Sequence, residues 1–348
     1  MRLFGHESDE AGAGRAGDAA IAGFWAWWAA TRPEVDALLE AGGVAAADEL
    51  LAPAIAAVHP GLVAEITPGR EALRSLVVSC DGDPELRPLA HRWALAAPPP
   101  DALWEFHPSR QASSHPADLV LEVDGREFAL GKLVLGLRVP PGAPRMDVSA
   151  YHPIFPDLGD ESRTEAAFLA LDRLIGEDEV ARWIGDLTAA TAPPIDAVPA
   201  VYLPAMVADL AAEHQGEQWA VLTGQTAGGA PLVAATRYPL RPVDHPLFDR
   251  HIAITLPYAE RDPDGLPAGD AAEALRAFEE RLTARLGDTA VLAVHMSSEG
   301  NRVLHVYGDP STDAVQRAEE VAETWTDGTP TVESTPDPGW LVVSPFLT

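Results

Sequence analysis

Three histidines in the last third of the chain lie in segments with the alternating pattern of β-strands. His251 lies in RHIAITL, His295 in VLAVHM and His305 in NRVLHVYG. Because successive side chains of a strand point to opposite faces, each histidine opposes the apolar residues of its own strand. With a three-residue loop over residues 298–300, the last two strands pair so that all three histidines share one face of a sheet. The spacing therefore predicts a histidine-bearing face.

Imidazole groups that share a face can bind a ligand or respond to pH. Tyr307 falls on the same predicted face, and Arg302 lies in the same strand. The sequence thus predicts a ligand-binding group, which comprises His251, His295, His305, Arg302 and Tyr307. Two alternatives stay open. A two-residue loop would place His295 on the face opposite His305, and another segment could cover the whole face.

The other residues with reactive or metal-binding side chains do not form a known catalytic or binding motif. The chain has no paired C-x-x-C, no H-E-x-x-H, no phosphate-binding loop and no G-x-S-x-G. We therefore predict no metal and no cofactor, and no catalytic residue can be assigned. Cys80, the one cysteine, ends an apolar run and is expected to be a buried structural thiol. Asp83 in DGDPE is expected to cap a helix. Five histidines precede prolines and are expected in loops: His59, His107, His115, His152 and His245.

The predicted elements that carry the histidines form the order β-α-β-β-α-β. Strands are expected at 250–258, 289–296, 301–308 and 330–335, and helices at 271–287 and about 312–325. This order is that of a ferredoxin-like split β-α-β sandwich. A β-hairpin formed by QWAVLTGQ and APLVAATRY precedes it. The hairpin and the tail GWLVVSPFL are expected to extend or cover the sheet.

The first half also mixes helices and strands, so the predicted class is α+β with two domains. We expect a flexible tail over 1–18, an N-terminal α+β domain over 19–215 and the ferredoxin-like domain over 216–348. Thr31 and Glu34 fit a capping box that would end one helix and start another. The stretch FWAWW places its large side chains within one arc of a helix. Trp25 and Trp28 are therefore expected in the core, with Trp27 at its margin.

The composition favours a protein partner over other partners. The formal net charge is −29, from 24 Lys+Arg against 53 Asp+Glu. A chain this acidic repels phosphate groups, so we predict no nucleic-acid and no membrane binding. An acidic surface suits a protein partner with a basic surface. No long apolar run appears that could span a membrane, and a cytoplasmic location is expected.

The second half resembles a known bacterial family. The residues that carry the resemblance are Trp219, Tyr258 with Gly265-Leu266-Pro267, Phe278-Glu279, Gly300-Asn301-Arg302 with Tyr307, and Trp340. In this order and spacing, residues from about 217 onward look like the family named domain of unknown function 695. The first half resembles uncharacterised bacterial proteins through FWAWW, VVSCDGDPELRP and LALDRLIGEDEVARWIG. The resemblance implies an architecture and assigns no catalytic residue.

Two functional hypotheses follow from the sequence. The first is a non-catalytic cytoplasmic binding or regulatory protein with a protein partner. The alternative is an enzyme whose site lies on the open sheet face of the C-terminal domain or in the cleft between domains, assembled from residues that leave no linear motif. A deep pocket at the histidines would favour the enzyme. An exposed apolar patch would favour the binding protein.

Overall fold

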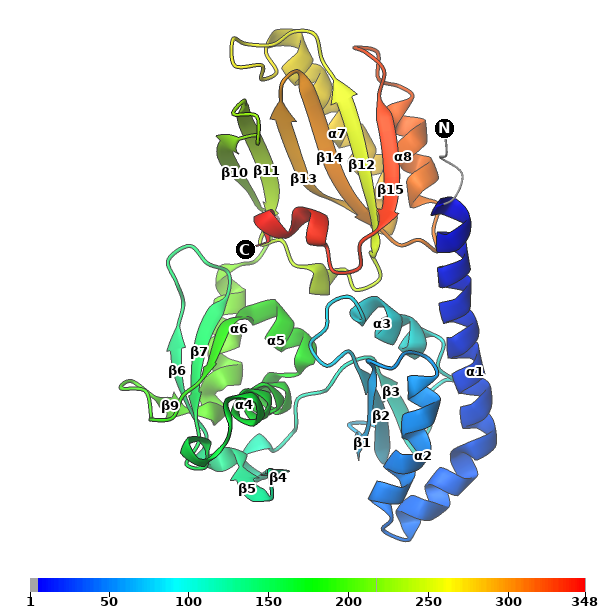
Figure 1. The fold of residues 1–348 in the computed structure, drawn as a ribbon, viewed down its shortest axis with the longest axis vertical. Coiled ribbons are helices and arrows are strands. Elements are labelled where there is room, and N and C mark those ends of the chain that lie inside the picture. Colours follow the sequence, from blue (N-terminus) through cyan, green and yellow to red (C-terminus); the bar gives the residue numbers. More distant parts are fainter. Residues whose placement is uncertain (1–5, 217, 348) are drawn as a thin grey trace. The chain divides into compact units, whose positions relative to one another are not determined.

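The computed structural model describes residues 6–216 and 218–347, and it has the predicted α+β class (Figure 1). The chain divides into two compact units, Met1–Gln215 and Gly216–Thr348. Each unit has its own sheets and its own apolar core. The elements of each unit are therefore described separately.

The first unit begins with three helices and a small sheet. The elements are α1 (His6–Glu40), α2 (Val44–Ala56), β1 (Val63–Pro68), β2 (Arg74–Ser79), α3 (Arg87–Leu95) and β3 (Trp104–His107). β1 pairs antiparallel with β2, and β2 pairs parallel with β3. Strand β2 is buried on both faces, as its apolar run LVV predicts.

The rest of the first unit forms a hairpin and a second sheet. The elements are β4 (Val120–Val123), β5 (Arg126–Ala129), β6 (Val134–Arg138), β7 (Met146–Tyr151), α4 (Asp160–Ile175), α5 (Glu177–Trp183), β8 (Ile184–Ala189), β9 (Val198–Pro199) and α6 (Leu203–Glu213). The strand order is β8-β7-β6-β9. Asp124 and Gly125 both have positive φ, as the two-residue hairpin turn between β4 and β5 requires. The segment EDEVARWIGDL contains α5 and the start of β8.

The first helix corrects two predictions. Residues 6–18, predicted as a flexible tail, belong to α1, and residues 1–5 of that tail lie outside the described residues. The helix also continues through Thr31 and contains Pro33, so the predicted break at the capping box is wrong. The physical reason is burial on both sides of the proline. Phe24 and Trp28 before it, and Val35 after it, belong to one core.

The tryptophans of FWAWW form the wall of that core. Trp28 is 2% exposed, and its ring meets the ring of Trp104 edge-on at 4.9 Å. Trp25 stacks on Trp93 at 4.8 Å and donates its indole N–H to the Trp93 carbonyl. Trp25 and Trp27 are half-buried against the same core. Burial is thus confirmed fully for Trp28, and Trp25 shares the marginal position predicted for Trp27.

The second unit contains one six-stranded antiparallel sheet. Its elements are β10 (Gln218–Gln225), β11 (Pro231–Tyr238), β12 (Arg250–Pro257), α7 (Gly269–Leu286), β13 (Ala290–Ser298), β14 (Asn301–Gly308), α8 (Ala314–Ala322) and β15 (Thr331–Pro336). The strand order is β10-β11-β13-β14-β12-β15. From β12 onward the element order is the predicted β-α-β-β-α-β, and the hairpin β10–β11 extends the sheet.

The two faces of this sheet are covered differently. Helices α7 and α8 lie behind it in Figure 1, and the C-terminal segment lies in front. One apolar stripe of α7 packs on the sheet, with Leu275, Phe278, Leu282 and Leu286 all buried. On the other face, Trp340 and Val343 of the C-terminal segment belong to a separate core cluster. The tail therefore covers the face that the helices leave free.

Candidate functional site

The turn between β13 and β14 determines where the histidines point. It has two residues, Glu299 and Gly300, whose φ values are 50° and 78°. Ser298 pairs with Asn301, and His295 pairs with Leu304. The predicted three-residue loop is therefore wrong, and the two-residue alternative is observed. A register shift between Leu292 and Val294 then alters the facing of the rest of β13.

This register separates the predicted group into two. His295 and Arg302 lie on the face toward α7, because His295 opposes Leu304 of the helix-side core. His251, His305 and Tyr307 lie on the other face. His251 pairs with Tyr307, and Tyr307 belongs to the core cluster of the C-terminal segment. The single histidine face predicted from the sequence is therefore corrected to two separate groups.

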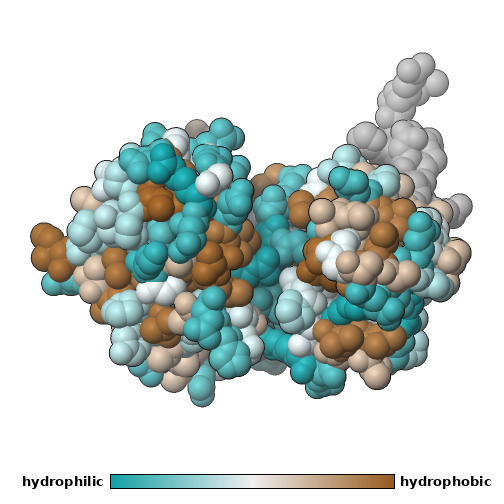
Figure 2. Space-filling model, turned by 90° about the horizontal axis from the view of Figure 1, so that it is seen from below, coloured by the Kyte–Doolittle hydropathy of each residue, from teal (hydrophilic) through white to brown (hydrophobic). Residues whose placement is uncertain are grey.

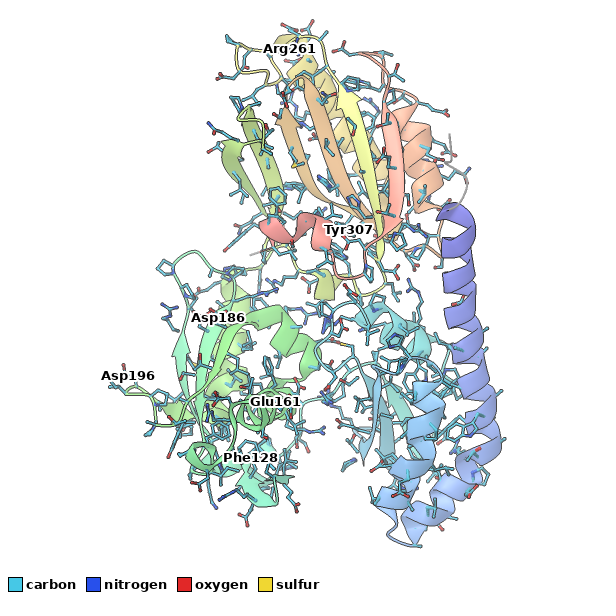
Figure 3. The ribbon with its side chains drawn as sticks, viewed as in Figure 1. Phe128, Glu161, Asp186, Asp196, Arg261 and Tyr307 are labelled. Carbon is cyan, nitrogen blue, oxygen red and sulfur yellow. The ribbon has the colours of Figure 1, made fainter. Side chains whose placement is uncertain are left out.

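The first group is buried beneath the C-terminal segment. His251 Nε2 and His305 Nδ1 lie 2.9 Å apart, and one imidazole donates to the other. The Tyr307 hydroxyl donates to Asp337 Oδ2 at 2.5 Å. His251 is 5% exposed, His305 7% and Tyr307 0%, so solvent has little access to any of them. Figure 3 shows Tyr307 beside the C-terminal segment.

Asp337 and Trp340 fasten the covering segment. Asp337 accepts the backbone N–H groups of Leu341 and Val342 at 2.8 and 3.0 Å. Trp340 stacks on Tyr307 with ring centres 3.9 Å apart, and its indole donates to the Phe248 carbonyl. The Asp337 carboxylate thus accepts hydrogen bonds both from the backbone at the start of the final turn and from the Tyr307 hydroxyl. The tail with Trp340 was expected only to extend or cover the sheet, and Asp337 carried no signal, because a strand pattern does not show where a tail folds back.

Burial keeps this group uncharged. Burial, together with the neighbouring His251, lowers the pKa of His305 to about 4. Burial also lowers the pKa of His251, against the charge of Asp337. The pKa of Tyr307 is raised by burial and by its bond to Asp337. His305 Nε2 has no hydrogen-bond partner. Both imidazoles are therefore held neutral and largely out of contact with solvent in this arrangement.

The second group lies on the helix-side face and is more open. Arg302 donates to Ser297 Oγ at 2.6 Å and lies 2.9 Å from His295 Nδ1. It also pairs with Glu279 of α7. Burial lowers the pKa of His295 to about 4, with a further contribution from Arg302. Burial raises the pKa of Glu279, against the effect of Arg302. The arginine therefore joins the sheet to α7.

Beside this group, the hairpin β10–β11 carries an apolar surface that we call the open shelf: Trp219, Val221, Val233 and Ala235. Val221 pairs with Ala235, and Ala235 with His295, so their side chains share a face. The Trp219 ring lies 5.5 Å from the His295 ring. The Arg237 guanidinium lies 5.8 Å from the centre of the Trp219 ring. Trp219 is 42% exposed and Val221 68%.

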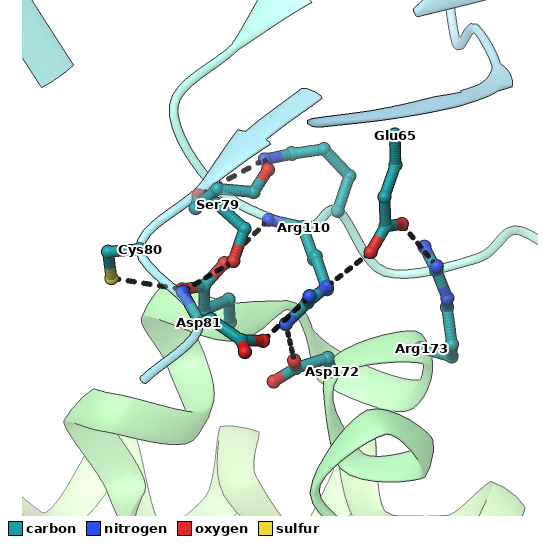
Figure 4. Close-up of polar contacts among 10 residues, drawn as sticks. Glu65, Ser79, Cys80, Asp81, Arg110, Asp172 and Arg173 are labelled. Carbon is teal, nitrogen blue, oxygen red and sulfur yellow. Dashed lines mark hydrogen bonds and ion pairs between the residues drawn. The ribbon is translucent and has the colours of Figure 1, made fainter. Parts of the chain in front are cut away.

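A third polar cluster lies inside the first unit (Figure 4). Arg110 donates to Glu65 at 2.6 Å, to Asp81 at 2.8 Å and to Asp172 at 3.3 Å. Burial raises the pKa of Asp172 to about 7, and the charge of Glu177 adds to the effect. These residues come from β1, from the turn after β2, from α4 and from the start of α5. The cluster therefore joins the sheet β1-β2-β3 to helices α4 and α5.

Cys80 lies at this cluster and is buried, as predicted. Its Sγ donates to Glu177 Oε1 at 3.1 Å. Burial raises the pKa of the thiol to about 12, and Glu177 adds to the effect. The thiol is therefore protonated and unsuited to nucleophilic attack. Among residues 6–216 and 218–347, no group of three or more His, Cys, Asp or Glu side chains could hold a metal ion.

Comparison with known proteins supports part of the predicted resemblance. Residues 218–348 match the family of unknown function DUF695. No curated protein and no solved structure matches the chain. The matched segment contains both histidine groups and the open shelf, and the family description gives them no role. No helix in the described part of the chain is long and apolar enough to cross a membrane.

Proposed function

We propose that the protein is a non-catalytic binding protein that docks a protein partner on the open shelf of its second unit. The observation that carries this proposal is the exposure of the hairpin's first strand. Seven of the eight residues of β10 are exposed, including Trp219, Val221 and Leu222. Tryptophan is a frequent energetic anchor of protein interfaces. His295 and Arg302 supply polar groups at the margin of the shelf.

The chemistry of the partner follows from the charge of the chain. With a formal net charge of −29, the molecule attracts a basic surface and repels nucleic-acid backbones and anionic lipids. The proposed partner therefore presents an apolar patch that is bordered by basic residues. A cytoplasmic location is part of the same proposal.

The buried histidine group supports binding over catalysis. His251, His305 and Tyr307 are covered by the C-terminal segment, so a substrate has no access to them in this arrangement. A surface depression on α7 is lined by residues outside both histidine groups: Asp270, Glu273, Ala274, Arg276, Ala277 and Glu280. The enzyme hypothesis for this covered sheet face thus lacks accessible reacting groups, and the more open group of His295 and Arg302 lies on the helix-side face.

Affinity capture from the native cell extract tests the proposal. We expect wild type to retain a protein in stoichiometric amount, and Trp219→Ala to retain at least about tenfold less. Leu95→Ala is the matched control, because Leu95 is 71% exposed and lies in the first unit. Equal recovery with Trp219→Ala, or no recovered protein with wild type, contradicts the proposal.

A further inference from the structure

Strand β10 is an edge strand without the features that usually block edge pairing. It ends the sheet order and pairs with β11 alone among the described strands. Its sequence QWAVLTGQ contains no charge and no proline over eight residues. The opposite edge, β15, contains Glu333 and Pro336. Charged residues and proline are the common means of protecting an edge, so β10 alone of these two edges lacks them.

Exposure alone does not single out this strand. The face in Figure 2 mixes hydrophilic and hydrophobic residues, and Leu95 and Ile195 elsewhere are 71% and 101% exposed. The difference is that β10 also offers a row of unpaired backbone N–H and C=O groups along its outer side. An occupant that pairs with this row must itself be an extended strand.

The absence of charge on β10 favours a second copy as this occupant. A basic strand would find no carboxylate on β10, and Glu279 of the adjacent helix is already paired with Arg302. An uncharged strand of β-forming residues matches itself, because no like charges are opposed. In the antiparallel register centred on Val221, the Val221 side chains of two copies meet, and Trp219 meets Thr223. Val–Val and aromatic–β-branched pairs are favourable across strands.

We propose that β10 pairs antiparallel with β10 of a second copy of the chain, with Val221 opposite Val221. Such pairing joins two six-stranded sheets into one and places the two open shelves side by side. The interface is small, because stable interfaces bury at least about 1,200 Å². The dimer is therefore expected to be weak and concentration-dependent. This inference goes beyond the proposed function, since it uses the edge of β10 and needs no other protein.

Register-specific disulfide formation in the purified full chain tests the pairing. We expect Val221→Cys to form a covalent dimer under mild oxidation. The control Leu222→Cys stays monomeric, because Leu222 then lies diagonal to its copy, at about 7 Å or more between Cβ atoms. Cys80 is buried and does not compete. Crosslinking of both variants alike, or of Leu222→Cys alone, overturns the register.

Light scattering after size exclusion tests the dimer without an introduced cysteine. We expect the mass of wild type to rise above the 36.9 kDa of one chain as concentration increases, and Val221→Lys to remain monomeric. A wild-type chain that is monomeric at every concentration overturns the inference. That result leaves the capture experiment with Trp219→Ala unaffected, so the two proposals can fail separately.

Discussion

Arg110 shows how strongly a single residue can couple parts of the first unit. It is 8% exposed and bonds to Glu65, Asp81 and Asp172. Arg110→Met leaves Asp81 and Asp172 without their cation, and it leaves Glu65 with Arg173 alone. We expect a loss of about 3–5 kcal/mol in the free energy of unfolding, measured by urea denaturation.

Two further variants show whether the loss comes from buried charge. Arg138→Met removes an arginine that is 76% exposed and paired with Asp147, and it is expected to cost less than about 1 kcal/mol. Adding Asp172→Asn to Arg110→Met should restore part of the loss, because it removes one uncompensated buried carboxylate. If Arg110→Met costs no more than Arg138→Met, the cluster does not stabilise the fold.

The buried histidine pair predicts how stability depends on pH. Burial lowers the pKa of His305 to about 4, so the unfolded chain binds this proton first as the pH falls. Its contribution to stability is complete above about 6.5 and is lost progressively toward 4, by about 1.4 kcal/mol for each pH unit. Urea denaturation over this pH range should show a shallower decline for His305→Gln, which can still bond to His251. An unchanged slope contradicts this assignment.

The sequence predicted the part of this site that depends on local strand alternation and missed the part that depends on long-range pairing. His251 and His305 were expected on the face away from the helices, because strand alternation is local, and both lie there. His295 was misplaced, because its facing depends on the length of the turn at Glu299-Gly300 and on a bulge in β13. Both are set by long-range pairing. Glu279 carried no signal, since one glutamate on a helix gives no indication of its partner.

At the scale of elements, α1 depends on its buried tryptophan. Trp28 is 2% exposed and packs on Trp104, so Trp28→Ala leaves a large cavity. We expect this substitution to cost about 3–5 kcal/mol. Trp27→Ala is the matched control, because Trp27 is only half-buried at the margin of the same core, and it should cost clearly less. Thermal denaturation followed by circular dichroism measures both. Equal costs would contradict the assignment of Trp28 to the core.

In the same helix, tertiary packing overrides the local signals that would end a helix. Thr31 and Glu34 have the spacing of a capping box, and Pro33 cannot donate its backbone nitrogen, a defect that costs about 3 kcal/mol within a helix. The helix nevertheless continues, since Phe24, Trp28 and Val35 are all buried in one core. Burial of each large side chain contributes about 1.5–3 kcal/mol. Their sum exceeds the cost of the proline, and no local pattern records that sum.

At the scale of the whole molecule, the net charge opposes association between copies, whereas the uncharged strand β10 favours it. Each copy has a formal net charge of −29, so two copies repel one another and a basic partner is attracted. Strand β10 carries no charge of its own, so the contact proposed between copies gains nothing from ion pairing. Self-association and partner binding should therefore respond to salt with opposite signs.

A salt series measures this difference directly. Raising the ionic strength from about 0.1 M to about 1 M shortens the screening length from about 10 Å to about 3 Å. We expect the dimer fraction of wild type to increase over this range, while recovery of the captured partner decreases. Val221→Lys should stay monomeric throughout, which separates specific pairing from salting-out. A dimer that dissociates as salt is added would be held by ion pairs, and the uncharged edge of β10 could not be its interface.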